Sequence, residues 1–178
     1  MRILTCEPDT EIIGQAIQSF GRNIRGVSPL LKKHNLNEID PKEWYPLKDW
    51  VNVLNDLNLN NNGMTNYFAM GIGDAKRLAL PPNAGNLTLP QFLEQWGATY
   101  LMQYRGENVG SIETTKINDQ HYQMTYVVTF PDDYIYGIAH GLAQRLLPSG
   151  TYFKVWYDTD TKRLDEGGTE TILHIRWE

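Results

Sequence analysis

The amino-acid sequence predicts an α+β domain in which amino-terminal helices pack on a carboxy-terminal, four-stranded antiparallel sheet. Apolar residues recur at three- and four-residue spacing through the first part of the chain, and this spacing becomes alternating after Gly106. One helical segment then separates two pairs of predicted strands. We therefore expect a single domain over residues 1–178, with a helical part at 1–105 and a strand–strand–helix–strand–strand part at 106–178.

The helical part begins with three predicted helices. Segment 8–24 carries apolar residues at helical spacing. A short second helix is expected at residues 39–44, because Asp40 can cap its start and Pro41 suits the first helical position. A third helix is expected from Pro46, since proline would break the preceding turn. The apolar stripe of this third helix consists of Leu47, Trp50, Val51, Leu54 and Leu57.

Two further helices complete this part. The asparagine-rich segment 54–63 is predicted to be a polar loop, because Asn side chains compete for the backbone hydrogen bonds of a helix. A helix is then expected over 65–80, ended by the two prolines 81 and 82. Thr88 and Gln91 form a capping box for a long helix that is expected to reach Tyr104. Its apolar face consists of Leu93, Trp96, Gly97, Tyr100, Leu101 and Tyr104.

The second part contains two predicted hairpins. Segments 108–117 and 120–130 alternate in polarity and are joined by a short turn, so they predict the first hairpin. Segments 151–159 and 170–177 predict the second hairpin, after a helix that begins beyond Pro131. The third strand is apolar on both of its sides, which predicts that both faces of the sheet are covered. One side of the second strand carries Tyr122, Met124, Tyr126, Val128 and Phe130.

Composition limits the classes of function. A net charge of −5 without a concentrated basic face argues against nucleic-acid binding. No apolar run approaches the roughly 20 residues that span a bilayer, and the acidic amino-terminal stretch does not resemble a secretory signal. The single cysteine, Cys6, excludes an internal disulfide. We therefore expect a cytoplasmic protein without a membrane span.

His140 is the most conspicuous candidate ligand for a metal or a haem. It lies between Gly137 and Gly141 on a predicted helix, at the flank of the apolar stripe. Glycine costs about 1 kcal/mol inside a helix, so this pair predicts that another backbone or a flat group packs closely there. We favour a flank histidine satisfied by one hydrogen bond, because no partner ligand is near in sequence. The remaining histidines are His34, His121 and His174, on separate elements.

No catalytic motif is present in the sequence. The acidic loop 158–168 lacks the residues of a calcium-binding loop. Asp132 and Asp133 follow a proline at a helix start, where carboxylates act as caps and meet the positive end of the helix dipole. Nucleophile elbows and phosphate-binding loops are also missing. We therefore expect no catalytic residues, no metal site and no enzyme activity.

Aromatic residues are the remaining signal. They cluster on one predicted helix and on one strand face, a pattern that usually marks a hydrophobic core. Buried phenols need hydrogen-bond partners, however, and an apolar cleft with a few polar groups is what a small-molecule pocket requires. We expect such a pocket between the helices and the sheet. Its predicted wall residues are Trp96, Tyr100, Tyr104, Tyr126, His140 and Trp156.

Three segments carry a resemblance to a known superfamily: "QYRGENVGSIE", "FPDDYIYGIAHGLAQRLLPSG" and "GGTETILHIRW". They resemble a ligand-binding superfamily that includes the 4-vinyl-reductase-type sensor domains, the haem–nitric-oxide-binding (H-NOX) domains and the small subunits of the transport-protein-particle (TRAPP) tether. The resemblance implies a non-enzymatic domain that holds a small apolar ligand between its helices and its sheet. It also implies a homodimer or a regulatory protein partner.

This sequence departs from each branch of the superfamily. The haem branch uses a Tyr-x-Ser-x-Arg motif on its strands and a histidine on a helix of the first half, and neither occurs in 106–130 or 88–104. The cysteines of the reductase-type branch are missing from 163–171, and Cys6 does not match the acylated position of tether subunits. We therefore expect no cofactor, haem included.

The leading hypothesis from sequence is a sensor or regulatory domain for a small hydrophobic ligand. One alternative is a protein-interaction or dimerisation module without a ligand. The other is a haem- or metal-binding sensor that uses His140.

Overall fold

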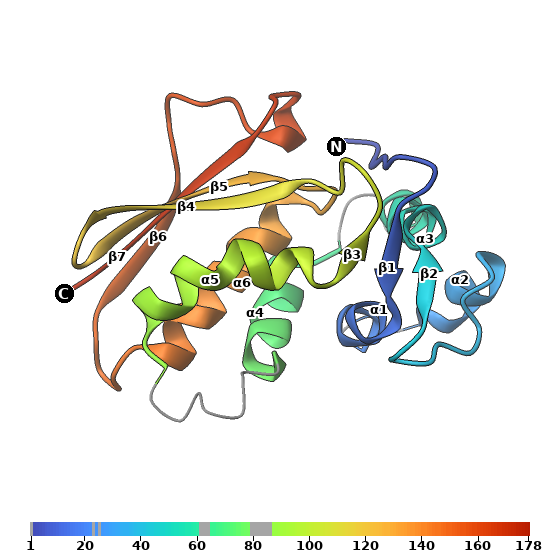
Figure 1. Ribbon diagram of the computed structural model, residues 1–178, viewed down its shortest axis with the longest axis horizontal. Coiled ribbons are helices and arrows are strands. Elements are labelled where there is room, and N and C mark those ends of the chain that lie inside the picture. The colour runs from blue at the N-terminus through green and yellow to red at the C-terminus, as the bar shows by residue number, and fades with distance from the viewer. Residues whose placement is uncertain (1, 23, 25, 61–64, 79–86) are drawn as a thin grey trace.

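The computed structural model describes residues 2–22, 24, 26–60, 65–78 and 87–178. It confirms the predicted fold class, because helices pack on a four-stranded antiparallel sheet whose strand order is β4-β5-β7-β6 (Figure 1). Both predicted hairpins are present in this sheet. Its strands are β4 (Ser111–Asn118), β5 (His121–Val127), β6 (Phe153–Tyr157) and β7 (Thr171–Trp177).

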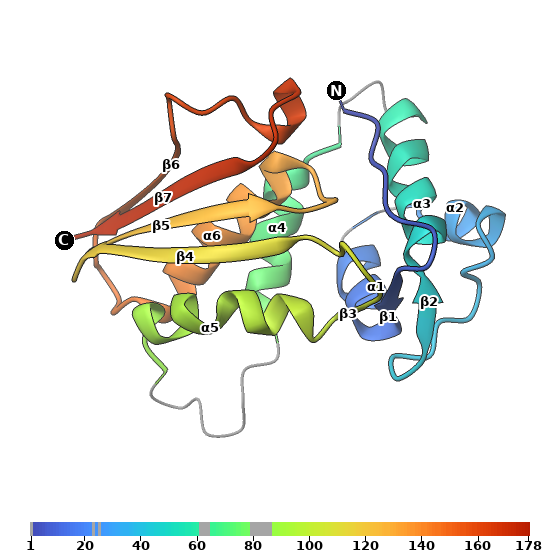
Figure 2. The ribbon, with the colours of Figure 1, turned by 45° about the horizontal axis from the view of Figure 1, so that its top comes forward.

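The helix-facing side of the sheet forms the main core. Tyr122, Met124 and Tyr126 alternate along β5 and are almost fully buried, as the polarity pattern predicts. Helix α5 (Leu89–Leu101) runs alongside β4 (Figure 2) and approaches it closely at Gly97, where a side chain would overlap the carbonyl oxygen of Ile112. Helix α5 thereby covers the edge of the sheet.

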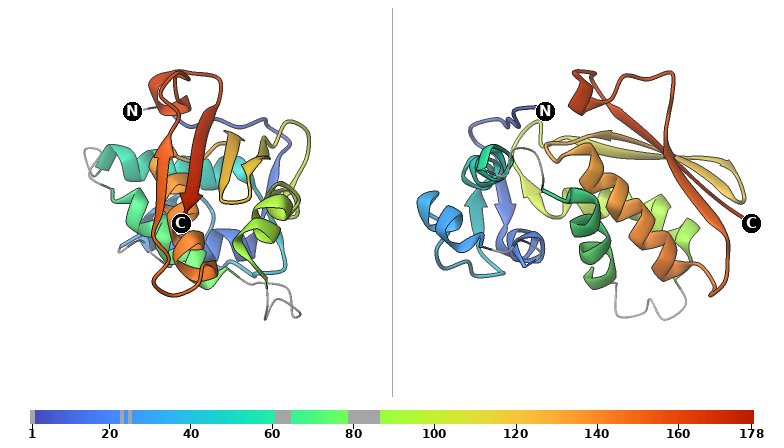
Figure 3. Two further views of the ribbon diagram at one scale, coloured as in Figure 1. Left: turned by 90° about the vertical axis from the view of Figure 1, so that its left-hand side faces the viewer. Right: turned by 180° about the vertical axis from the view of Figure 1, so that it is seen from behind.

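Helices α4 (Tyr67–Arg77) and α6 (Asp132–Leu146) lie side by side beneath the sheet (Figure 3). Their backbones approach at glycines on both helices, as the glycine spacing in α6 predicts. A Cβ on Gly71 or on Gly137 would overlap backbone atoms of the opposite helix, and a Cβ on Gly141 would lie 2.7 Å from the Cβ of Ala75. This seam fixes α6 in position over the sheet.

The first part of the chain forms a separate layer at the end of the molecule far from the carboxy terminus (Figure 1). It contains a small sheet with strand order β2-β1-β3, which the sequence did not predict. The elements are β1 (Glu11–Ile13), α1 (Gly14–Gly21), α2 (Ser28–Lys33), β2 (Trp44–Pro46), α3 (Leu47–Asn60) and β3 (Tyr104–Arg105).

Strand pairing overrides helix propensity in this small sheet. Ile12 pairs with Tyr45 on one side and with Tyr104 on the other, so segment 8–24 begins as a strand rather than a helix. The short helix predicted at 39–44 is also wrong. The Asp40 carboxylate accepts a hydrogen bond from the backbone N–H of Lys42, at 2.8 Å, and so caps a tight turn that leads into β2. Likewise, Tyr104 belongs to β3, and α5 ends at Leu101.

The asparagine-rich segment is helical up to residue 60, so the predicted loop over 54–60 is wrong. The physical reason is tertiary: Asn55 exchanges hydrogen bonds of 2.9 Å with the backbone N–H and carbonyl of Leu4, and Asn58 accepts one from the hydroxyl of Tyr67. Side chains engaged in this way no longer compete with the helix backbone. Residues 61–63 and prolines 81 and 82 lie outside the described residues.

Two other predictions have clear outcomes. The capping box of Thr88 and Gln91 is present at the start of α5. Asp132 does not cap α6; its carboxylate instead accepts hydrogen bonds from the hydroxyl of Thr171, at 2.6 Å, and the backbone N–H of Asp165, at 3.0 Å. Among the described residues, no helix is both long and apolar enough to cross a membrane.

Helices α4, α5 and α6 all lie on one face of the sheet (Figure 3). On the opposite face the ring of Trp156 stacks against His174, with 5.1 Å between ring centroids, and packs against His121, at 5.3 Å. The apolar residues on both sides of β6 are therefore explained by this cluster of rings rather than by a second layer of helices.

A candidate ligand cavity between the helices and the sheet

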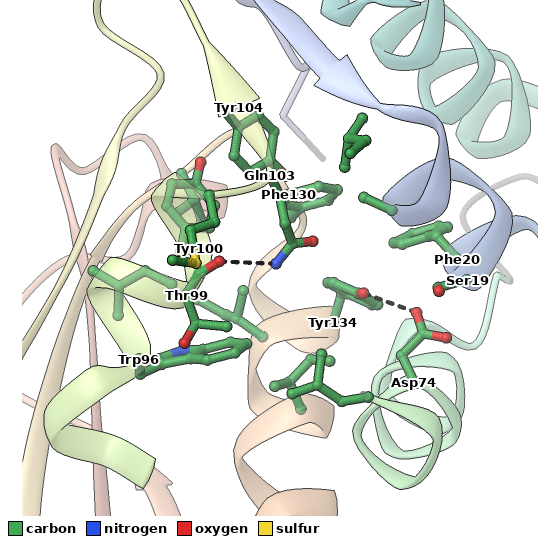
Figure 4. A pocket seen from close by; sticks show the side chains of 18 of the residues that line it. Ser19, Phe20, Asp74, Trp96, Thr99, Tyr100, Gln103, Tyr104, Phe130 and Tyr134 are labelled. Carbon is green, nitrogen blue, oxygen red and sulfur yellow. Dashed lines mark hydrogen bonds between the residues drawn. The ribbon is translucent and has the colours of Figure 1, made fainter. Parts of the chain in front are cut away.

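A cavity of about 350 Å³ lies where α1, α4, α5, α6 and the sheet meet (Figure 4). This volume is at the lower end of the roughly 300–1,000 Å³ that ligand pockets occupy. The half-buried Thr99 of α5 and the exposed Met102, directly after α5, line its margin, and buried aromatic side chains line its interior. The cavity is therefore open to solvent at one end and apolar inside.

Aromatic rings from helices and strands of both parts of the chain line the cavity. Phe20 of α1 packs against Tyr134 of α6, with 4.4 Å between ring centroids. Tyr100 of α5 packs against Tyr104 of β3, at 4.6 Å. Trp96 lies one helical turn before Tyr100, so both project from the same side of α5. Large flat rings placed in this way bound a space without filling it.

A phenol–carboxylate pair lies on the α4 side of the cavity. The hydroxyl of Tyr134 donates a hydrogen bond of 2.8 Å to the carboxylate of Asp74, which is only 6% exposed (Figure 4). Arg77 lies 3.7 Å from the same carboxylate. Burial and the nearby negative charge together raise the pKa of Tyr134 well above its ordinary value, so its hydroxyl stays protonated.

Tyr100 occupies a different electrostatic setting. Its hydroxyl donates a hydrogen bond of 2.6 Å to the backbone carbonyl of Val109. Burial alone raises the pKa of Tyr100, and no acidic side chain contributes to the rise. Tyr100 therefore differs from Tyr134, because no nearby carboxylate would repel the ionised form of Tyr100.

Two buried donors on the α5 side lack strong acceptors. The indole N–H of Trp96 has no hydrogen-bond partner, although the side chain is only 7% exposed. The hydroxyl of Tyr126 donates to the sulfur of Met124 at 3.4 Å, and a thioether is a weak acceptor. Burial raises the pKa of Tyr126, and the adjacent indole of Trp96 partly offsets that rise. The two donors are therefore neighbours.

Of the six side chains predicted from sequence to line the pocket, four lie on the cavity wall: Trp96, Tyr100, Tyr104 and Tyr126. His140 lies on another side of α6, between the rings of Phe68 and Phe153, at centroid distances of 5.5 and 4.9 Å. Trp156 lies on the opposite face of the sheet. His140 is out of helical phase with the residues of α6 that line the cavity. Trp156 points to the other face of the sheet, because side chains alternate along a strand.

Sequence reasoning missed Phe20, Asp74 and Tyr134. Asp74 had a usable signal, because it is an acidic residue among apolar and small residues of a predicted helix, and buried carboxylates need partners. Phe20 had none, since its place on the wall depends on how the first layer docks. In the described part of the chain, no cluster of three or more histidine, cysteine or acidic side chains could hold a metal ion.

Solved structures of H-NOX domains share this fold. A structure described as probing haem distortion in the H-NOX family is 17% identical, covers 93% of this chain and 92% of its own, and has a TM-score of 0.69. A mutant of the T. Tengcongensis H-NOX is 17% identical, with 93% and 94% covered and a TM-score of 0.68. An H-NOX protein from S. oneidensis is 13% identical, with 94% and 96% covered and a TM-score of 0.64.

No protein-family model matches the sequence, and no curated protein matches it either. At these identities the likeness to the solved structures establishes the fold. The H-NOX branch of the predicted superfamily is thus represented among the structural neighbours, while the reductase-type and tether branches rest on the sequence resemblance alone. The expectation that the domain has no cofactor is corrected here, because the neighbours are haem–nitric-oxide-binding domains.

Proposed function

We propose that this chain is a non-enzymatic sensor domain that binds haem in the cavity between α1, α4, α5, α6 and the sheet. The supporting observation is the coincidence of an H-NOX fold with an aromatic-lined cavity at the junction of the helices and the sheet. Flat aromatic walls suit a flat macrocycle, because rings of the wall can pack against its apolar faces.

The donor set of the cavity fits haem through oxygen. Among the described lining residues there is no histidine or cysteine, whereas four tyrosines, Tyr100, Tyr104, Tyr126 and Tyr134, offer phenol oxygens. Tyrosine is an established axial ligand of haem iron. Burial raises the pKa of Tyr100, and a nearby charge raises the pKa of Tyr134 and of Tyr104 further, so we assign the iron to the oxygen of Tyr100.

The other side chains would act on the environment of the cofactor. Bound haem would supply an iron centre able to take a diatomic gas. Phe20 would exclude water from one side of the cavity. Asp74 would keep the hydroxyl of Tyr134 protonated. This hydroxyl could donate to a polar ligand only after its hydrogen bond to Asp74 is broken. His140 lies outside this cavity, so the chemistry proposed here does not require it.

Titration with hemin, followed by the visible absorption spectrum, tests the proposal. We expect saturable binding of one hemin per chain, with the affinity lowered at least about tenfold in Tyr100→Phe, because the ring stays and only the iron-binding oxygen is lost. Tyr152→Phe is the matched control, since Tyr152 is 69% exposed on the surface. Absence of saturable binding contradicts the proposal. Binding that is lost in His140→Ala and kept in Tyr100→Phe would move the iron to His140.

A second candidate function is a sensor for a small hydrophobic ligand that contains no iron. One observation favours it: two neighbouring buried donors, on Trp96 and Tyr126, lack strong acceptors within the protein. Native mass spectrometry of protein purified from its host would detect a retained organic compound. A mass equal to the bare chain, with no exchangeable ligand, would count against this candidate. A homodimer or a regulatory partner stays a prediction, to be tested by light scattering.

A further inference from the structure

The α5 side of the cavity differs in polarity from the rest of its wall. Trp96 and Tyr126 are 7% and 1% exposed, and both line the cavity. The indole N–H of Trp96 lies beside the Tyr126 oxygen without a hydrogen bond of normal geometry, and the Tyr126 hydroxyl has only the sulfur of Met124 as an acceptor. A buried donor without a good acceptor is unfavourable, so this corner is incomplete in the protein alone.

Charge around this corner restricts what can complete it. Arg77 is the one cationic side chain among the described lining residues, and it lies beside Asp74 on α4. Figure 4 shows Trp96 and Asp74 on opposite sides of the cavity. A carboxylate placed beside Trp96 would therefore be buried without a counter-charge, which is strongly unfavourable. A neutral carbonyl oxygen avoids this cost and has two lone pairs, one for each donor.

We infer that the α5 side of the cavity recognises a neutral carbonyl oxygen on a flat apolar ligand, held by hydrogen bonds from Trp96 and Tyr126. This inference rests on the second candidate function, in which the ligand contains no iron. Ketones of fused aromatic rings and quinones belong to the required class. Purely hydrocarbon ligands fill the same space but offer neither donor an oxygen acceptor.

A matched pair of probes isolates the carbonyl group. Fluorenone and fluorene have the same tricyclic frame and differ only in the carbonyl oxygen. We expect fluorenone to bind the wild-type chain about tenfold more tightly than fluorene, as measured by calorimetry, because two buried donors gain an acceptor. The infrared carbonyl band of bound fluorenone should move to lower frequency than the band of the compound in an apolar solvent.

Variants assign the effect to the two donors. Trp96→Phe and Tyr126→Phe should each bring the ratio of the two affinities closer to one. Trp50→Phe is the control, because the indole N–H of Trp50 is also buried and unpaired but does not line the cavity. It should leave the ratio unchanged. If a donor variant does not fold, two measurements on the wild-type chain still test the inference: the ratio of the fluorenone and fluorene affinities, and the infrared shift of bound fluorenone.

Each outcome separates this inference from the proposals on which it rests. Equal affinity for the two probes, with an unshifted carbonyl band, overturns the inference and leaves ligand binding by the cavity intact; a trapped water then satisfies the donors. If neither probe binds while hemin does, the iron-free candidate fails together with the inference. If hemin and both probes all fail to bind, every proposal for this cavity fails.

Discussion

Helix α6 presents two faces that the protein uses in opposite ways. One face is sealed against α4, where Gly137 and Gly141 bring the two helices into backbone contact. The other face carries Tyr134 and Ile138, which line a cavity of about 350 Å³. Gly137 and Ile138 are adjacent in sequence, yet Gly137 lies in the packed seam and Ile138 lines the cavity.

The size of the side chains determines which face of α6 is tightly packed and which face borders free space. Glycines one turn apart remove volume from a seam, so the helices approach until backbone atoms touch and cannot shift independently. On the opposite face the ring of Tyr134 packs at a tilt against the rings of Phe20 and Phe130, and all three border the cavity. A cavity wall built on a locked helix keeps its shape, which favours a ligand of fixed, flat form. The comparison can be tested by adding volume to each face in turn.

The largest effect is expected at the seam. Gly137→Ala places a methyl group against the carbonyl oxygen of Phe68, so α4 and α6 must separate. Overpacking of this kind costs about 3 kcal/mol, since backbone rather than a flexible side chain must move. Urea denaturation should show a clear loss of stability. Gly21→Ala is the control, because a Cβ there meets nothing within 4 Å. Equal stability of the two variants would contradict the close seam.

A smaller effect on stability is expected on the cavity face. Ile138→Phe adds its extra volume to existing free space, so the free energy of unfolding should fall by about 1 kcal/mol or less. Ligand binding should fall by at least about tenfold, because the new ring occupies the space of the ligand. Hemin or fluorenone titration, paired with urea denaturation, measures both quantities. A large loss of stability with normal binding would mean that the cavity is elsewhere.

Sequence patterns predicted the elements that are stabilised locally or by one repeating contact. The capping box at Thr88, the alternation along β5 and the glycine spacing of α6 each predicted what the structure shows. The small sheet escaped prediction because each of its strands is two or three residues long and pairs with partners distant in sequence. The helical conformation around Asn58 was not predicted for a similar reason. The side chains of Asn55 and Asn58 hydrogen-bond to residues outside the helix, Leu4 and Tyr67.

The cavity was predictable in part. Trp96 and Tyr100 share one helix face, and Tyr126 lies on an apolar strand face, so their placement follows from local periodicity. The contribution of Phe20 depends on the docking of α1, which no local pattern encodes. His140 shows the limit of such reasoning: a flank position on a helical wheel does not say which neighbour meets the flank, and here it is Phe68 and Phe153.

The smallest effect is expected at His140, whose ring lies outside the cavity, between Phe68 of α4 and Phe153. Burial lowers the pKa of His140 below its ordinary value of about 6.5. The unfolded chain therefore binds a proton more readily than the folded one as pH falls below about 6.5, and stability decreases as pH falls toward the folded pKa. His140→Gln should reduce the difference in urea midpoint between pH 7 and pH 5 and leave hemin and fluorenone affinities unchanged. An unaltered pH dependence would mean that the His140 ring is not desolvated. A loss of ligand binding would show that the surroundings of His140 are coupled to the cavity through α6.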